Sequence, residues 1–150
     1  MRDFGCCTGS AAALPHVKPM TKTALVTGAE GFIGSRLVNS LHTKAWRVLG
    51  TYPGKGTNSF PALPNLSFVP CDLGNQQRME QVLKKHQPGY VFHLGAQSLR
   101  TVSWADPVET FWSNIIGPLY LFAAIRRVQR PPVVGTGYSS GRHKRTQIGK

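Results

Sequence analysis

Residues 23–37 read TALVTGAEGFIGSRL, a short apolar run followed by three glycines at fixed spacing. The run 23–27 fits a strand, and Gly28, Gly31 and Gly34 lie where a tight turn leads into a helix. Such a turn needs a residue without a Cβ at Gly28, a phosphate can approach the backbone closely at Gly31, and Gly34 lets the helix pack onto the strand. The N–H groups of the helix start would then face the phosphates. The stretch predicts a nucleotide-phosphate site, although a tight turn without a ligand has the same spacing.

Strands and helices alternate along the chain on both sides of this motif. The apolar patterns predict strands over residues 22–27, 46–51, 66–70, 89–94 and 133–134, and helices over residues 32–43, 75–86 and 106–127. Residues 52–64 are rich in proline and glycine and are expected to form a loop. The alternation predicts an α/β fold, a Rossmann-like doubly wound parallel sheet that is incomplete at the C-terminus.

Two of the expected helices carry further signals. The helix over residues 32–43 places four apolar residues on one face: Ile33, Leu37, Val38 and Leu41. The helix over residues 106–127 is expected to begin at Asp106 as its N-cap, with Glu109 completing a capping box. Pro118 should interrupt this helix, because it lacks the N–H that would bond the carbonyl of Asn114.

The 150 residues fit one domain, expected over residues 20–137. Residues 1–19 have no sustained period and are expected to be a disordered extension, with an organelle-targeting segment as the alternative. Residues 138–150 are expected to form a basic irregular tail. The three cysteines form neither a disulfide framework nor a metal-ligand pattern, so no metal site is expected. A reducing cytoplasm is the expected location.

The formal net charge of +12 raises the question of a nucleic-acid partner. Residues 126–150 carry seven basic and no acidic side chains, so most of the excess lies at the end of the chain. That tail contains one aromatic residue, Tyr138, and no recognisable nucleic-acid module, so no nucleic-acid partner is expected. No uninterrupted apolar run reaches the length of a membrane span, so no membrane partner is expected either.

Four motifs in order resemble the extended short-chain dehydrogenase/reductases, the NAD-dependent epimerase/dehydratase family. They are TGAEGFIG at 27–34, CDL at 71–73, HLGAQS at 93–98 and NIIG at 114–117. The chain departs from the family pattern at Gly95, where alanine is usual, and at Pro118, where threonine is usual. The resemblance implies that residues 20–137 are a truncated NAD(P)-binding Rossmann domain.

The resemblance also implies roles for individual residues. Asp72 would contact the adenine, and Asn114 would give structural support to a catalytic lysine through its carbonyl and a water. The residues expected to bind the cofactor are Gly28, Gly31, Phe32, Ile33, Gly34, Asp72, Leu73, Leu94, Gly95, Ala96 and Gln97. The acidic residue that holds the ribose in NAD enzymes is missing near Thr51 and Tyr52, which mildly favours NADP over NAD. Lys55 could serve a 2′-phosphate or be a solvated loop residue.

The catalytic part of the family pattern is incomplete in this sequence. Family chemistry uses a tyrosine whose pKa is lowered by a lysine four residues later, and the chain has no Tyr-x-x-x-Lys. Thr136, in VVGTG at 133–137, could stand where the family places a catalytic hydroxyl. The implied activity is NAD(P)-dependent chemistry at C4 of a nucleotide sugar by a dehydratase, epimerase or reductase. The chain as written is expected to be inactive.

The substrate and the partners are expected from finer similarity. RTVSWADP at 100–107 is similar to a stretch in GDP-mannose 4,6-dehydratases and GDP-4-keto-6-deoxymannose reductases, which favours a GDP-linked sugar. Full-length members of the family commonly form homo-oligomers, and Trp112, Tyr120 and Phe122 could serve such contacts. A non-catalytic dinucleotide-binding module is the alternative reading.

Overall fold

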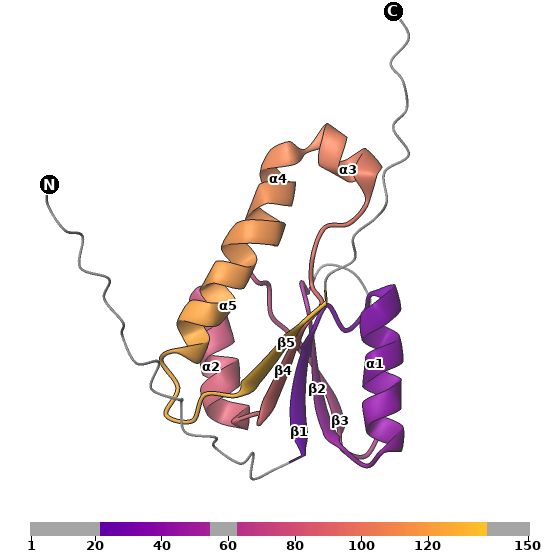
Figure 1. Cartoon of the computed structure of the whole chain (residues 1–150), viewed down its shortest axis with the longest axis vertical. Helices are drawn as coiled ribbons and strands as arrows, with labels where there is room; N and C mark the ends of the chain where they lie inside the picture. The colour runs from indigo at the N-terminus through magenta and orange to yellow at the C-terminus, as the bar shows by residue number, and fades with distance from the viewer. Residues whose placement is uncertain (1–21, 55–62, 138–150) are drawn as a thin grey trace, which may run out of the picture.

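The computed structural model describes residues 22–54 and 63–137 of the chain. Its centre is a five-stranded sheet in the order β3-β2-β1-β4-β5, in which all the neighbouring strands are parallel (Figure 1). The strands are β1 (Thr23–Thr27), β2 (Arg47–Tyr52), β3 (Leu66–Pro70), β4 (Tyr90–His93) and β5 (Val133–Thr136). This order confirms the predicted Rossmann-like, doubly wound parallel sheet.

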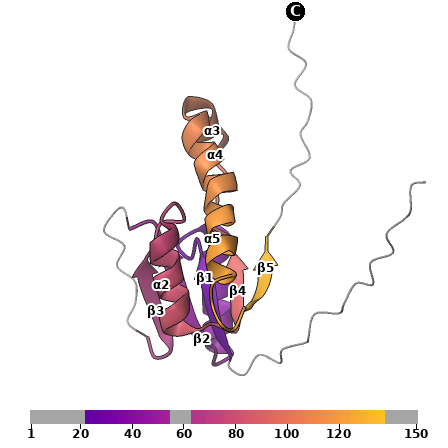
Figure 2. The ribbon, with the colours of Figure 1, turned by 90° about the vertical axis from the view of Figure 1, so that its left-hand side faces the viewer.

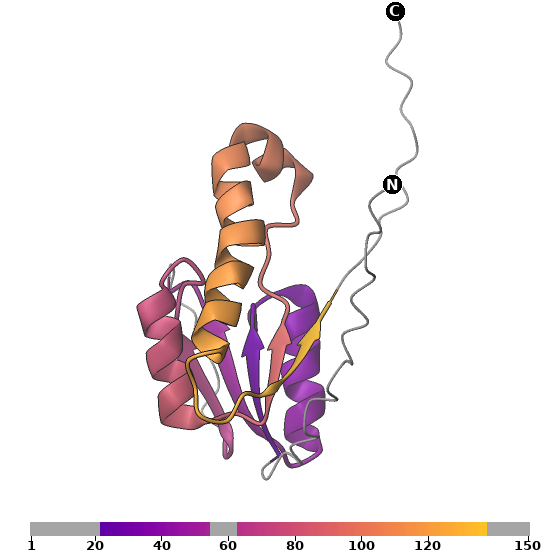
Figure 3. The same cartoon turned by 60° about the vertical axis from the view of Figure 1, so that its left-hand side comes forward.

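Helices cover both faces of the sheet. Helix α1 (Phe32–Thr43) lies on one face, and α2 (Gln76–His86) and α5 (Gly117–Ile125) lie on the other (Figures 1 and 3). Three shorter elements precede α5: α3 (Arg100–Ala105), α4 (Pro107–Phe111) and the π-helical segment η1 (Trp112–Ile116). Figure 2 shows that α3 and α4 extend beyond the end of the sheet, while α5 packs beside α2.

Alternation along β1 divides the core into two layers. Ala24 and Val26 pack with Val38 of α1, whereas Leu25 packs with the buried residues of α2 and α5. All of these β1 side chains are fully buried, because β1 is the central strand and has a helix layer on each side. The run Ala24-Leu25-Val26 is therefore apolar without interruption for a structural reason.

Most predicted elements match the observed ones to within a residue or two. Helix α1 and strand β3 have the predicted bounds, and β5 extends the predicted 133–134 to Thr136. One packing prediction is wrong: Ile33 is 62% exposed and does not share the buried face of α1. It lies in the first turn of the helix, while Val38 and Leu41 further along are buried.

The third predicted helix begins at Asp106 as expected, and a separate short helix, α3, precedes it. Helix α3 was not predicted, because residues 100–105 carry no apolar period. Asp106 is the expected N-cap of α4, and its Oδ1 accepts the N–H of Glu109 at 2.9 Å. This bond is one half of the expected capping box. The other half does not form, since the N–H of Asp106 donates to the carbonyl of Val102, at the end of α3, rather than to Glu109.

The predicted interruption at Pro118 takes the form of a change in hydrogen-bond register directly before the proline. Helical residues continue from Pro107 to Ile125, and the register changes in η1. The N–H of Gly117 donates to the carbonyl of Trp112, five residues earlier. A π turn directly before Pro118 lets the helix continue although Pro118 has no N–H to donate.

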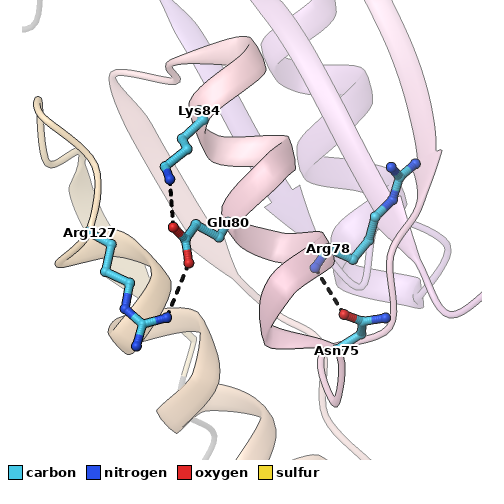
Figure 4. Close-up of polar contacts among 5 residues, drawn as sticks. All are labelled: Asn75, Arg78, Glu80, Lys84 and Arg127. Atoms are coloured by element: carbon cyan, nitrogen blue, oxygen red, sulfur yellow. Dashed lines mark hydrogen bonds and ion pairs between the residues drawn. The ribbon is translucent and has the colours of Figure 1, made fainter.

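One carboxylate ties α2 to the end of α5. Glu80 accepts from Lys84 at 2.7 Å and from Arg127 at 3.2 Å, so a single side chain pairs with two cations (Figure 4). These two hydrogen bonds hold the pKa of Glu80 below its ordinary value. At the other end of α2, Asn75 caps the helix by accepting the N–H of Arg78 at 2.9 Å (Figure 4).

The helical run Pro107–Ile125 is long and apolar enough to cross a membrane, with a mean hydropathy of 1.2. Length and composition are weak evidence, because a helix of a folded domain can meet both conditions. Here the C-terminal half of the run packs on the sheet and α2 through Leu121, Ala124 and Ile125. The expected extension over residues 1–19, the tail over residues 138–150 and Lys55 lie outside the described residues.

The buried face of α5 gives a test of this packing. Leu121 is fully buried. Leu121→Ala should lower the free energy of unfolding by about 2–5 kcal/mol, because it leaves a cavity between α5 and the sheet. Leu99→Ala, a control at a leucine that is 62% exposed and lies outside the helical run, should change it by less than about 0.5 kcal/mol in the same urea titration. Equal effects of the two substitutions would show that α5 does not pack in this orientation.

Candidate functional site

A cleft of about 450 Å³ lies at the carboxyl ends of four strands. It sits over β1 and β4, where the order of the strands reverses direction, which is the usual place for a ligand in an open α/β sheet. The residues that line it are Gly28, Glu30, Gly31, Thr51, Tyr52, Pro53, Cys71, Asp72, Leu73, Gly74, Leu94, Gly95, Ala96, Gln97, Glu109, Trp112 and Ser113.

The turn after β1 requires its glycines. Gly28 has a φ of +66°, a left-handed conformation that favours glycine. A Cβ on Gly28 would lie 2.7 Å from the Cα of Gly95, and a Cβ on Gly34 would lie 2.0 Å from the carbonyl oxygen of Gly28. The turn, the start of α1 and the segment after β4 therefore meet backbone to backbone. Gly34 has the packing role that the sequence predicted.

The start of α1 faces this cleft without a side-chain cap. Gly31 is the N-cap and has no side chain to accept a hydrogen bond from the first turn, and that turn contains no acidic residue. The first N–H groups of a helix lack partners within the helix, and the helix dipole adds positive potential there. An anion held at Gly31 would satisfy these groups, and a phosphate has suitable charge and oxygen acceptors.

Asn114 fastens the segment after β4 to the helical run. Its Oδ1 accepts the N–H of Gln97 at 2.7 Å, and its Nδ2 donates to the carbonyl of Gln97 at 2.9 Å. The sequence assigned Asn114 a role through its backbone carbonyl, toward a lysine. The side-chain pairing with Gln97 was not anticipated, and it holds one wall of the cleft against η1.

The end of β3 supplies a carboxylate and a buried thiol. Asp72 Oδ1 accepts the N–H of Gly74 at 2.9 Å, which fixes the carboxylate at the edge of the cleft. Burial raises the pKa of the Cys71 thiol to about 11, so the thiol is protonated at neutral pH. Cys71 is therefore a small buried residue of the core rather than a nucleophile.

Most of the predicted cofactor-binding residues gather in this cleft. Those that line it are Gly28, Gly31, Asp72, Leu73, Leu94, Gly95, Ala96 and Gln97. Gly34 lies beneath the turn, and Phe32 and Ile33 are 76% and 62% exposed at the start of α1. Thr136 ends β5 as the register neighbour of His93 and does not line the cleft.

Sequence reasoning missed the far wall of the cleft. Glu109, Trp112 and Ser113 come from α4 and η1, and Ser113 Oγ donates to Glu109 Oε1 at 3.3 Å. Their spacing of three and four residues places them on one side of a helix. That spacing was visible in the sequence, but the sequence did not indicate that this side of the helix faces the cleft.

The charged side chains in the described part of the lining are acidic. Within the described residues, the ionised side chains that line the cleft are the carboxylates of Glu30, Asp72 and Glu109, and no lysine or arginine lines it. A bound phosphate would therefore depend on backbone N–H groups. Across the same described residues, no cluster of three or more His, Cys, Asp or Glu side chains is arranged to hold a metal ion.

The parallel sheet, the glycine turn and the cleft at the strand-order reversal define a Rossmann-like domain. Residues 24–145 match the NAD dependent epimerase/dehydratase family, and the chain belongs to that family.

Individual relatives agree with this assignment. The chain is 33% identical to a GDP-mannose 4,6-dehydratase from Vibrio cholerae, covering 71% of this chain and 32% of that protein. It is 32% identical to a dTDP-glucose 4,6-dehydratase from Xanthomonas campestris, covering 69% of this chain and 31% of the relative. The structure resembles that of the UDP-glucose 4-epimerase of Thermus thermophilus in complex with NAD, with a TM-score of 0.64 and 31% identity over 70% of this chain and 34% of that one.

The chain spans about a third of the length of the curated relatives it matches. The similarity therefore covers the sheet and its cleft, while the activities of these relatives belong to longer proteins.

The close approach of Gly34 to Gly28 can be tested by stability. Gly34→Ala should lower the free energy of unfolding by about 3 kcal/mol, because its Cβ would overlap the backbone of the turn. Gly74→Ala is the matched control, since its Cβ would meet no atom closer than 3.5 Å. Thermal and urea unfolding of the two variants should separate them clearly. A Gly34→Ala protein as stable as the control would show that α1 does not start against the turn.

Proposed function

We propose that the chain is the dinucleotide-binding part of an enzyme that acts on a nucleotide sugar. The observation that carries the proposal is the uncapped start of α1 beside Gly28 and Gly31, at the carboxyl ends of the parallel strands. A backbone cradle of this kind suits a pyrophosphate. Membership of the epimerase/dehydratase family supports the same ligand.

Each wall of the cleft then has a role. The N–H groups at the start of α1 would hold the pyrophosphate, with Phe32 and Ile33 contributing backbone rather than side chains. Asp72, fixed by Gly74, would accept a hydrogen bond from the adenine amine beside Leu73. The segment Leu94–Gln97 would border the nicotinamide half of the cofactor.

The cofactor is proposed to be NAD rather than NADP. The missing acid near Thr51 and Tyr52 removes a repulsion against the 2′-phosphate of NADP. It supplies no group that would bind this phosphate. Two carboxylates of the described lining, those of Asp72 and Glu109, would repel an additional phosphate. The similar Thermus thermophilus structure is a complex with NAD.

The substrate is proposed to be a GDP-linked hexose, on the similarity of residues 100–107 and on the Vibrio cholerae relative. A bound NAD would accept hydride from C4 of the sugar. Thr136, at the end of β5, is the proposed site of the hydroxyl that polarises the sugar oxygen. Because the sequence has no Tyr-x-x-x-Lys, we propose that this chain binds the cofactor without turning over substrate.

Calorimetry tests the cofactor proposal. The full chain should bind NAD at least about 10-fold more tightly than NADP, because the 2′-phosphate would meet carboxylates in the cleft. Gly31→Glu, which places a carboxylate at the helix start, should abolish the heat of NAD binding. Ser35→Glu, four residues further along α1, is the charge-matched control and should retain it. Tighter binding of NADP would overturn the cofactor assignment, and binding that survives Gly31→Glu would overturn the site.

A homo-oligomer is proposed from an exposed apolar surface on the helical run. Five large apolar residues recur every three or four positions and are 40–66% exposed: Val108, Phe111, Ile115, Leu119 and Phe122. The π turn at Trp112–Ile116 shifts the register within this run, so these side chains form an exposed apolar surface rather than one straight seam. The proposed occupant of this surface is the same surface of a second copy.

Sedimentation measures this association. Ile115→Glu should shift the chain toward monomer, because it places a charge in this apolar surface. Gln81→Glu, an exposed charge-adding change on α2, should leave the association unchanged. If the unmodified chain sediments as a monomer, the surface is free for the remainder of a longer protein rather than for a second copy.

A further inference from the structure

The last residues of β1 and β4 form a side-chain pair that is partly buried. Thr27 and His93 are register neighbours in the parallel sheet, and Thr27 Oγ1 lies 2.7 Å from His93 Nδ1. The Thr27 side chain is fully buried. The residues that follow each of them, Gly28 and Leu94, line the cleft. The pair therefore sits directly beneath the proposed cofactor site.

The hydroxyl of Thr27 also serves the segment after β4. It accepts the N–H of Gly95 at 3.2 Å and that of Leu94 at 3.2 Å, and Leu94 shares its N–H with the carbonyl of Thr27. A threonine hydroxyl has one proton and two lone pairs. Because both lone pairs face N–H donors, the proton is left to donate to His93 Nδ1. His93 Nδ1 must then be an acceptor, and a neutral ring carries its proton on Nε2.

We propose that Thr27 and His93 form a positioning pair that holds Leu94 and Gly95 in place for the dinucleotide, and that the pair works only while His93 is the neutral Nε2–H tautomer. The role of the pair toward the dinucleotide rests on the proposed function. The hydrogen bonding among Thr27, His93, Leu94 and Gly95 rests on the geometry alone.

The surroundings of His93 favour the neutral ring. Burial lowers the pKa of His93 from its ordinary value of 6.5, and no charged side chain of the described residues adds to that shift. Its register neighbours on β1 and β5 are Thr27 and Thr136, neither of which titrates in this range. The folded protein therefore resists protonation at this ring.

The sign of the pH dependence follows from this shift. Above pH 6.5 both the folded and the unfolded chain hold a neutral ring, and the pair is intact. As the pH falls below 6.5 the unfolded chain takes up a proton that the fold disfavours, so stability falls. Once His93 is protonated, its Nδ1–H faces a hydroxyl whose lone pairs are already used. The Thr27 proton then has no acceptor, and the contacts to Leu94 and Gly95 weaken.

Nitrogen NMR of the ¹⁵N-labelled full chain tests the pair directly. His93, assigned by the signals lost in His93→Asn, should show the Nε2–H tautomer at pH 7.5 and should remain neutral below pH 6.5. Amide exchange at Leu94 and Gly95 should be about 10-fold faster in Thr27→Val, which lacks the hydroxyl, than in Thr27→Ser, which keeps it. An Nδ1–H tautomer, or equal exchange in the two variants, would overturn the pair.

Cofactor affinity tests the positioning role. NAD binding should weaken about 10-fold between pH 7 and pH 5 in the unmodified chain. It should weaken less than 2-fold in His93→Asn, whose amide oxygen can accept from Thr27 but takes up no proton in this range. The same acid loss in His93→Asn would overturn the positioning role. If no variant binds NAD, the proposed function fails, while the tautomer and exchange measurements still decide the pair.

Discussion

The structure depends on the close contact of three backbone segments around Gly28. The left-handed turn at Gly28 places its carbonyl so close to Gly34 that no side chain fits between the turn and α1. The same turn lies against Gly95, with no room for a Cβ at Gly28. These contacts bring the end of β1, the start of α1 and the segment after β4 to one point. The cleft exists because these three segments meet through their backbones, with no side chains between them.

The arrangement explains why polar side chains surround the cleft but do not fill its centre. The hydroxyl of Thr27 and the amide of Asn114 hold the wall after β4, at Leu94, Gly95 and Gln97. Asp72 is fixed by Gly74 on the opposite side. The N-cap of α1 is Gly31, which has no side chain to bond the N–H groups of the first turn. A site built in this way offers fixed backbone donors to an anion, so little side-chain conformational entropy is lost when the anion binds.

Much of this could be predicted from the sequence, because local patterns and tertiary packing agree in the sheet. The apolar run 24–26, the glycine spacing and the cap at Asp106 each specify their own local structure. Helix α3 could not be predicted, because its residues have no apolar period. The π turn before Pro118 could not be predicted either, because no single residue type indicates a change of hydrogen-bond register. Glu109 and Ser113 were missed as cleft residues because their place depends on where the helical run stands over the sheet.

The central claim is that the cleft binds a dinucleotide through the backbone at the start of α1. A crystal structure of the full chain grown with NAD would test it most directly. The account predicts the pyrophosphate against the N–H groups that follow Gly31, with the adenine beside Asp72. NAD bound elsewhere on the chain, or bound in the cleft with its phosphates away from α1, would contradict it.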